Sequence, residues 1–281
     1  GKVYPDNEMK LVKVIDLNSK TFAPKELYLD ENVLVVIGTT NHYYPMPMPR
    51  DGKLSMPYYD YRNTVSATIY DISDKSNIKL VREVEIDGHY VSSRKIGSAL
   101  YLIANKDINY YLLQEGGETD KPAYRDTAII NEFVEIDFDS IRYFPNSIEP
   151  NYLLVAGLDL NKHDKQVEVS TFLGSGQNIY ASPQNLYVAV TQYDFSDTTG
   201  LNSRDTEVYQ FALDKGSVNY KSKGKVPGSL LNQFSMDEHN GFFRVATTTG
   251  EMWRTDEHTS KNNVYVLDKS LKIVGKVKDI A

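Results

Sequence analysis

Residues 231–268 read LNQFSMDEHNGFFRVATTTGEMWRTDEHTSKNNVYVLD and contain one repeat of the fold. Two β-rich runs, residues 232–235 and 242–247, flank a tip that ends in Asn240-Gly241. This dipeptide is typical of tight hairpin turns, because both residues tolerate the positive φ angles that such turns need. The stretch therefore predicts a hairpin.

The same stretch predicts two further strands, residues 264–267 and 271–277, after a polar loop. Four antiparallel strands make one small twisted sheet, which cannot bury both its faces alone. The chain supplies neighbours of the same kind, because four rounds of strands recur. Their second strands read LVVI, LYLI, LYVA and FFRV, beginning at Leu34, Leu100, Leu186 and Phe242. Repetition of a four-stranded unit is the sequence signature of a β-propeller.

We therefore predict an all-β fold, a β-propeller arc of four four-stranded antiparallel blades plus one N-terminal strand. The blades are expected at residues 24–87, 88–173, 174–228 and 229–281. Residues 11–17, within the segment 8–20, resemble the outer strand of a preceding blade, since the Lys-Leu-Val triplet at residues 10–12 recurs at residues 79–81. Such an arc has two open sheet edges, which favour self-association. We expect the chain to be a fragment of a larger propeller.

The composition suits a globular chain and excludes several classes of function. The 281 residues are enough for a sizeable core, and the 21 Tyr favour strands. The net charge of −7 leaves no basic excess for nucleic acid. The absence of Cys excludes disulfides and thiolate metal sites and fits an extracellular bacterial protein. No apolar run approaches the roughly 18–20 residues of a membrane span, and the first residues are not a signal peptide.

An Asp ends the third strand of every round, at Asp71, Asp159, Asp214 and Asp268. Four carboxylates in equivalent positions could be mistaken for a site. An Asp directly after a strand, however, accepts hydrogen bonds from backbone N–H groups of the next turn. Repetition in every round supports this structural interpretation.

The chain also resembles a known family. The resemblance rests on QFSMDEHNGFFRVATTTG at residues 233–250, YVSSRKIG at residues 90–97 and IRYFP at residues 141–145. These segments are similar to bacterial and archaeal secreted proteins with a C-terminal β-propeller, which is distantly related to the WD-type repeats. Residues 24–28 and 122–128 fit the same pattern, so the resemblance covers essentially the whole chain. It implies a propeller fold and a secreted or cell-surface location, with no established biochemical activity.

The long insertions all fall between the second and third strands of a round, in the b–c connection of a blade. They cover residues 39–64, 105–150, 192–205 and 248–263. The b–c connections of a propeller share one face, so that face is elaborated while the opposite face keeps short turns. Long loops on a rigid scaffold are where binding commonly resides.

Aromatic and Arg side chains gather in these insertions, and such residues are enriched at binding surfaces. The candidate ligand-binding residues are Tyr43, Tyr44, Tyr58, Tyr59, Tyr61, Tyr110, Tyr111, Tyr124, Arg125, Trp253 and Arg254. The rings could instead pack on one another and on the next blade as a local core. As binding groups they would suit a protein partner or a glycan.

The insertion at residues 192–205 holds three carboxylates with hydroxyl, Gly and amide residues between them. Hard oxygen ligands on a turn are what Ca²⁺ takes, so the candidate Ca²⁺ ligands are Asp194, Asp197 and Asp205. The spacing is not that of an EF-hand, and acidic loops are commonly only solvated. The five His are scattered without ligand spacing.

No catalytic or phosphate-binding motif is present. We therefore expect a non-catalytic, secreted or cell-surface binding module that recognises a macromolecule or glycan through its b–c loops. The alternative is a hydrolase-type enzyme with a site at the axial channel, where inner strands such as residues 26–29 and 232–235 converge. Clustered carboxylates at the channel mouth would favour the enzyme. A third interpretation is a purely architectural spacer.

Overall fold

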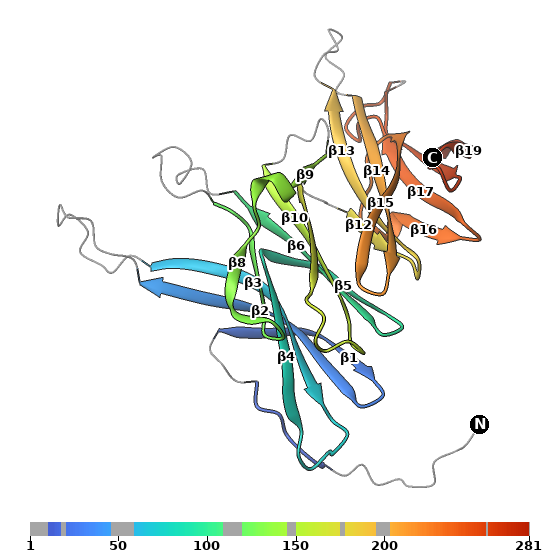
Figure 1. Ribbon diagram of the computed structural model, residues 1–281. Coiled ribbons are helices and arrows are strands. Elements are labelled where there is room, and N and C mark those ends of the chain that lie inside the picture. The colour runs from blue at the N-terminus through green and yellow to red at the C-terminus, as the bar shows by residue number, and fades with distance from the viewer. Residues whose placement is uncertain are drawn as a thin grey trace, which may run out of the picture.

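The computed structural model describes residues 11–17, 21–45, 59–108, 120–144, 150–174, 178–194, 203–256 and 258–280. Within these residues the regular elements are the strands β1 to β19 and two short 3-10 turns. Figure 1 shows the strands gathered in four sheets that follow one another along the chain, from blue to red. The predicted all-β arc of four blades is confirmed for the described residues.

The first sheet has the order β1-β2-β3-β4-β7-β8, with β1 (Phe22–Asp30), β2 (Val33–Pro45), β3 (Tyr59–Asp71), β4 (Lys79–Asp87), β7 (Ala123–Asp126) and β8 (Ile130–Glu135). The second has the order β5-β6-β10-β11-β9, with β5 (His89–Ile96), β6 (Ala99–Asp107), β10 (Asn151–Asp159), β11 (Glu168–Leu173) and β9 (Arg142–Tyr143).

The third and fourth sheets keep the chain order of their strands. The third contains β12 (Asn178–Ala181), β13 (Asn185–Asp194), β14 (Ser203–Asp214) and β15 (Ser217–Pro227). The fourth contains β16 (Met236–His239), β17 (Phe242–Thr249), β18 (Lys261–Leu267) and β19 (Ile273–Ile280). The 3-10 turns are η1 (Phe138–Ser140) and η2 (Gln233–Ser235).

Apolar side chains fill the space between consecutive sheets and hold the arc together. One cluster joins the first and second sheets through aliphatic side chains such as Ile37. A second joins the second and third sheets around Phe172 and Phe211. A third joins the third and fourth sheets, where the rings of Tyr187 and Phe243 stack 4.2 Å apart. Among the described residues no such cluster joins the first sheet to the fourth, so the arc is open.

The Asp residues that end the third strands act in turns, as predicted. Asp71, Asp159 and Asp268 each accept a hydrogen bond from the backbone N–H two residues later, at 2.8, 3.1 and 2.8 Å. The third round uses a different turn after Asp214. There Lys215-Gly216 adopts positive φ values of 45° and 95° and closes a two-residue hairpin.

The inner strand of the fourth round begins later than predicted. Residues 233–235 form η2 rather than part of a strand, because the side chain of Asn232 caps this turn and accepts a hydrogen bond from the Phe234 backbone N–H at 2.9 Å. Strand β16 starts where Met236 becomes buried. The turn at Asn240-Gly241 has φ values of 52° and 76°, which confirms the predicted hairpin.

Residues 11–17 form no strand, which differs from the predicted outer strand of a preceding blade. Leu11 and Val14 are 79% and 67% exposed. A strand is stable only beside a hydrogen-bonding partner, and none of the described strands pairs with these residues.

All four predicted loops contain strand residues, and the regular structure is most extensive in residues 39–64 and 105–150. Pairing of β2 with β3 continues to Pro45 and Tyr59, so most of the described part of residues 39–64 extends a long hairpin. Within residues 105–150, the hairpin β7–β8 pairs with β4 of the first sheet, and β9 pairs in parallel with β11. Figure 1 shows the green hairpin lying against the first sheet. The outer edge of β4 offers unpaired backbone groups, which the hairpin satisfies.

The described residues contain no helix of the length and apolar character that a membrane crossing requires.

Gly157→Ala tests how closely the second and third sheets approach. A Cβ at Gly157 would lie 1.8 Å from the carbonyl oxygen of Gly216, whereas one at Gly275 would meet nothing closer than 3.6 Å. Overpacking a tight site costs about 1–3 kcal/mol. Urea denaturation should therefore show a clear loss of stability for Gly157→Ala. The control Gly275→Ala should stay within about 0.5 kcal/mol of the wild type. Equal stability of the two variants would contradict this contact.

Candidate functional site

A cleft of about 500 Å³ opens on the outward face of the first sheet, the face turned away from the second sheet. Strand alternation builds it: along β2, Ile37 faces the core, so Thr40 and His42 face outward. The neighbouring strands contribute Ser66, Thr68 and Tyr70 from β3, Glu83 and Glu85 from β4, and Arg125 from β7. Asp16, Leu17 and Phe22 complete the lining, so polar side chains of the sheet share the cleft with two apolar ones, whereas the faces between the sheets are apolar.

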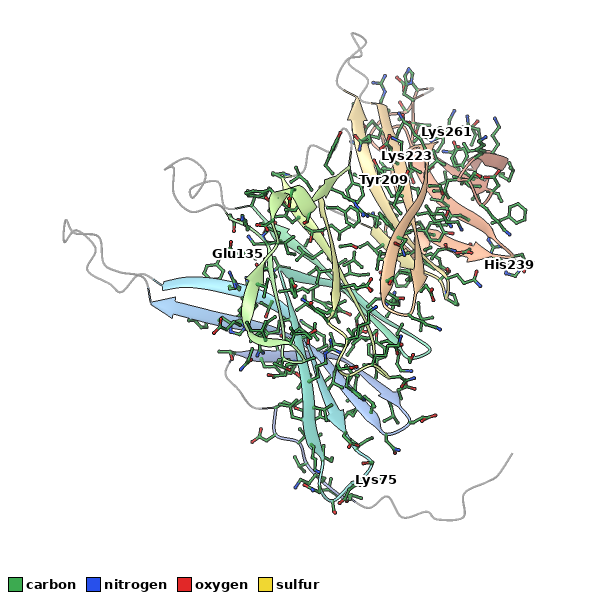
Figure 2. The ribbon with its side chains drawn as sticks, viewed as in Figure 1. Lys75, Glu135, Tyr209, Lys223, His239 and Lys261 are labelled. Atoms are coloured by element: carbon green, nitrogen blue, oxygen red, sulfur yellow. The ribbon has the colours of Figure 1, made fainter. Side chains whose placement is uncertain are left out.

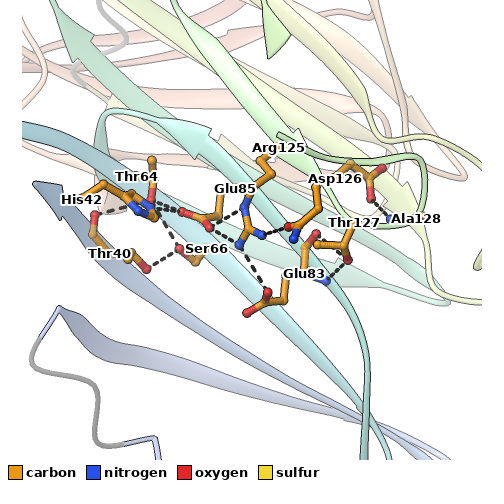
Figure 3. A network of polar contacts seen from close by, with 11 residues as sticks. Thr40, His42, Thr64, Ser66, Glu83, Glu85, Arg125, Asp126, Thr127 and Ala128 are labelled. Atoms are coloured by element: carbon orange, nitrogen blue, oxygen red, sulfur yellow. Dashed lines mark hydrogen bonds and ion pairs between the residues drawn. The ribbon is translucent and has the colours of Figure 1, made fainter. Parts of the chain in front are cut away.

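Glu85 is the centre of the polar network in this cleft (Figure 3). Its side chain is 3% exposed. It accepts hydrogen bonds from the Thr64 hydroxyl at 2.5 Å, His42 Nε2 at 2.7 Å and Arg125 Nε at 2.9 Å. Burial alone would raise the pKa of Glu85, but these three donors outweigh it and lower the pKa. The group is therefore held as a charged carboxylate.

Arg125 reaches this carboxylate because β7 pairs with β4 in a register that sets Arg125 opposite Glu85. Its Nη2 also lies 3.3 Å from Glu83. The next residue, Asp126, points to the other face and pairs with Arg82, with Nε–Oδ1 and Nη2–Oδ2 distances of 2.9 and 2.6 Å. Arg82 and Asp126 are only 2% and 1% exposed. Adjacent residues of β7 thus fasten the inserted hairpin to both faces of the sheet.

The strand β8 covers one side of the network with Phe133. Its ring lies edge-on to His42 at 5.4 Å, and the guanidinium carbon of Arg62 lies 4.5 Å from its centroid. Arg62 Nε is 3.3 Å from Asp87, which also accepts a hydrogen bond from the Ala123 backbone N–H at 2.9 Å. Burial raises the pKa of Asp87 to about 6, against the lowering effect of Arg62.

The fold agrees with the comparison to known proteins. Residues 2–281 match the family described as the beta propeller domain. The chain belongs to this family. It is similar to an uncharacterised protein of Methanocaldococcus jannaschii, 25% identical over 272 residues, or 75% of this chain and 43% of that protein. An uncharacterised protein of Archaeoglobus fulgidus is 32% identical over 121 residues, or 43% of this chain and 18% of that protein. The chain spans less than half the length of both archaeal relatives.

The propeller separates the predicted ligand-binding residues into several groups. Tyr43 and Tyr61 are cross-strand partners on the long hairpin and are 63% and 64% exposed. Since successive residues of a strand face opposite sides, Tyr43 lies on the side opposite His42 and the cleft. Tyr124 also faces away from the cleft, where its hydroxyl accepts a hydrogen bond from Gln166 at 2.6 Å. Arg125 alone of this set lines the cleft.

Trp253 and Arg254 lie in the fourth blade, between β17 and β18. The Trp253 side chain is 76% exposed, and the Arg254 guanidinium carbon lies 5.6 Å from its ring. Arg254 also pairs with Asp256 through its Nε at 3.0 Å. Outside the described residues lie Tyr58, Tyr110, Tyr111 and the side chains of Tyr44 and Tyr59.

The predicted Ca²⁺ site has one member among the described side chains. Asp205 lies in β14 and forms an ion pair with Lys225 at 2.7 Å. Asp197 and the side chain of Asp194 lie outside the described residues. In the described part of the chain no three His, Asp or Glu side chains are arranged to hold a metal ion. A Ca²⁺ site in this loop remains a prediction.

Carboxylates on the inner strands join neighbouring blades. Glu26 accepts a hydrogen bond from the Ser93 hydroxyl of the second blade at 2.7 Å. Glu238 of the fourth blade accepts hydrogen bonds from Ser182 and Tyr187 of the third, at 2.7 and 2.9 Å. Ser93 is 0% exposed, so a substrate cannot reach its hydroxyl. These carboxylates are used in contacts between blades, which gives no support to the axial hydrolase site.

Glu85 and Arg82 were not predicted as site residues, although the sequence contains a signal for them. Strand β4 reads KLVREVEID, with charges of both signs among apolar residues of a strand that must be largely buried. Buried charges need partners. The positive partner of Glu85, Arg125, was predicted only as a ligand-binding residue.

Asp87→Asn tests the buried carboxyl beside the cleft. The pKa of Asp87 rises from 3.8 to about 6 on folding, so between these pH values the folded chain keeps a proton that the unfolded chain releases. The free energy of unfolding therefore falls as pH rises through this window, by roughly 3 kcal/mol at about 1.4 kcal/mol per pKa unit. The side-chain amide of the Asp87→Asn variant does not titrate, so the stability of the variant lacks this dependence on pH.

Urea denaturation of both proteins at about pH 4 and about pH 7 measures this effect. The difference in stability should shift in favour of Asp87→Asn at the higher pH. A difference that is the same at both pH values would contradict the raised pKa.

Proposed function

We propose that this propeller is a non-catalytic binding module and that the cleft of the first blade is its binding site. The observation that carries the proposal is a cleft of about 500 Å³ with a wall of polar side chains on strands that are joined by buried ion pairs. Ligand pockets have volumes of about 300–1,000 Å³. A rigid cleft limits the entropy that is lost when a ligand binds.

The chemistry of the walls favours a ligand with many hydroxyl groups, and we propose a neutral glycan. Thr68 and Tyr70 line the cleft, and their hydroxyls have no hydrogen-bond partner among the described residues. Glu83 lies beside them, with a side chain that is 36% exposed. Glu83 can accept hydrogen bonds from sugar hydroxyls, and the two free hydroxyls can donate or accept them.

The network around Glu85 supports binding rather than catalysis. A general acid or base must exchange a proton near the working pH. The pKa of Glu85 is instead lowered, and three donors engage the carboxylate. The group therefore suits a fixed charge that organises the cleft.

The proposal includes a secreted or cell-surface location, where glycans are abundant. The absence of Cys from all 281 residues and the exposed aromatic side chains Tyr43, Tyr61 and Trp253 are compatible with that location. The proposal extends to a distant relation with the WD-type repeats and to binding of a protein partner.

Thr68→Trp tests the cleft directly, because the indole would fill the space in front of the outward face. On an array of neutral oligosaccharides, the wild type should capture at least one glycan. Thr68→Trp should weaken that capture at least about tenfold, or about 1.4 kcal/mol. The matched control is Ala246→Trp, at an exposed outward position of the fourth blade.

The control should bind as the wild type does. Capture that survives Thr68→Trp, or no capture of any neutral glycan by the wild type, would overturn the proposal. Unfolding midpoints of both variants show whether the fold is preserved.

A further inference from the structure

A second cleft, of about 550 Å³, lies between the second and third blades. Its walls come from β9, β11, β14 and β15, so the insertion of the second blade helps to build it through β9. Figure 2 labels Tyr209 of its floor and Lys223 of its rim. It shares no lining residue with the cleft of the first blade.

The floor of this second cleft is a rigid aromatic surface. The ring of Phe144 lies 5.3 Å from Phe172 and 4.5 Å from Tyr209, and Phe172 lies 5.0 Å from Phe211. All four residues are at most 4% exposed. The Tyr209 hydroxyl donates a hydrogen bond to Glu207 at 2.5 Å. The floor belongs to the core between the blades and keeps its shape without a ligand.

The rim has groups that are free to bind. Tyr143 and Tyr220 are 70% and 51% exposed, and β9 is held in place by its parallel pairing with β11. Arg142 and Asn219 are also exposed. Among the described residues, the side chains of Arg142 and Asn219 and the two Tyr hydroxyls have no hydrogen-bond or ion-pair partner. This differs from the first cleft, where Glu85 and Arg125 are engaged with each other.

The charge of the lining is positive in a chain whose net charge is −7. Arg142 and Lys223 line the cleft, and none of the lining residues that the structure describes is a carboxylate. Glu207 lies 4.0 Å from Lys223 Nζ and already accepts a hydrogen bond from the Tyr209 hydroxyl. Within the part of the chain that the structure describes, Arg142 therefore has no carboxylate partner and lies beside exposed aromatic rings. Guanidinium groups pair strongly with carboxylates.

We propose that this second cleft binds an anionic sugar unit, the uronate of an acidic polysaccharide. The apolar face of the sugar ring stacks on the exposed Tyr143 and Tyr220, which supply flat contact area with a polar tip. The carboxylate pairs with Arg142, and the ring hydroxyls bond to Asn219 and the Tyr hydroxyls. Five polar rim groups suit a polyhydroxylated ligand better than a purely aromatic anion. The proposal stands on its own observations and does not depend on the cleft of the first blade.

Calorimetric titration with trigalacturonate tests the proposal. The wild type should bind it in a saturable manner, with an affinity that falls as salt is added. Arg142→Gln should weaken binding at least about tenfold, since a hydrogen-bonded charge is removed. Tyr220→Ser should weaken it by a similar factor without changing the charge. The matched control Arg244→Gln, an exposed Arg of the fourth blade, should bind as the wild type does.

Three comparisons make the outcome decisive. The methyl ester of trigalacturonate should bind at least about tenfold more weakly, because it lacks the charge. Thr68→Trp, in the other cleft, should leave binding unchanged. No saturable binding by the wild type, equal binding by Arg142→Gln or the methyl ester, or loss of binding in Thr68→Trp would each overturn the proposal. Benzoate that binds as tightly as trigalacturonate would overturn the assignment to a sugar.

Discussion

The buried ion pair between Arg82 and Asp126 is the interaction on which the elaborated part of the propeller depends. Arg82 also donates a hydrogen bond to the Lys165 carbonyl at 2.8 Å, and Asp126 accepts one from the Val167 backbone N–H at 2.8 Å. The pair thus joins the outer strand of the first blade, the inserted hairpin and a turn of the second blade. Removing one partner of such a pair costs about 3–5 kcal/mol, because the other charge stays buried.

The two proposed binding surfaces follow from this attachment. The pair fixes β7, and β7 delivers Arg125 to Glu85, so the cleft of the first blade has a charged wall that does not reorganise. The chain then returns through β9 to the second blade, where Arg142 and Tyr143 complete the aromatic cleft. One insertion therefore supplies residues to both clefts. Both proposed glycan-binding surfaces lie where an inserted segment meets a strand edge or a gap between blades.

Local features were predictable from the sequence, and distant pairings were not. The Asn240-Gly241 turn and the turn-forming Asp71 depend on neighbouring residues, and both were predicted correctly. The β-branched and aromatic runs likewise indicated the four blades. Asp126 lies 44 residues after Arg82, and no local pattern shows that the two residues meet. The insertion was therefore predicted as a loop, and its aromatic residues as one surface, although strand alternation directs Tyr124 and Arg125 to opposite sides.

Hydrogen exchange of the Ala123–Asp126 amides is the most direct test that the ion pair holds the inserted hairpin. In the wild type these amides should be protected from hydrogen exchange, as should the amides of β17 in the fourth blade. Arg82→Met should lose protection in β7 while β17 keeps it. Arg244→Met, which breaks an exposed ion pair with Asp237, should leave the protection of both β7 and β17 unchanged. Protection of β7 that is unchanged in Arg82→Met would contradict the central role of this pair.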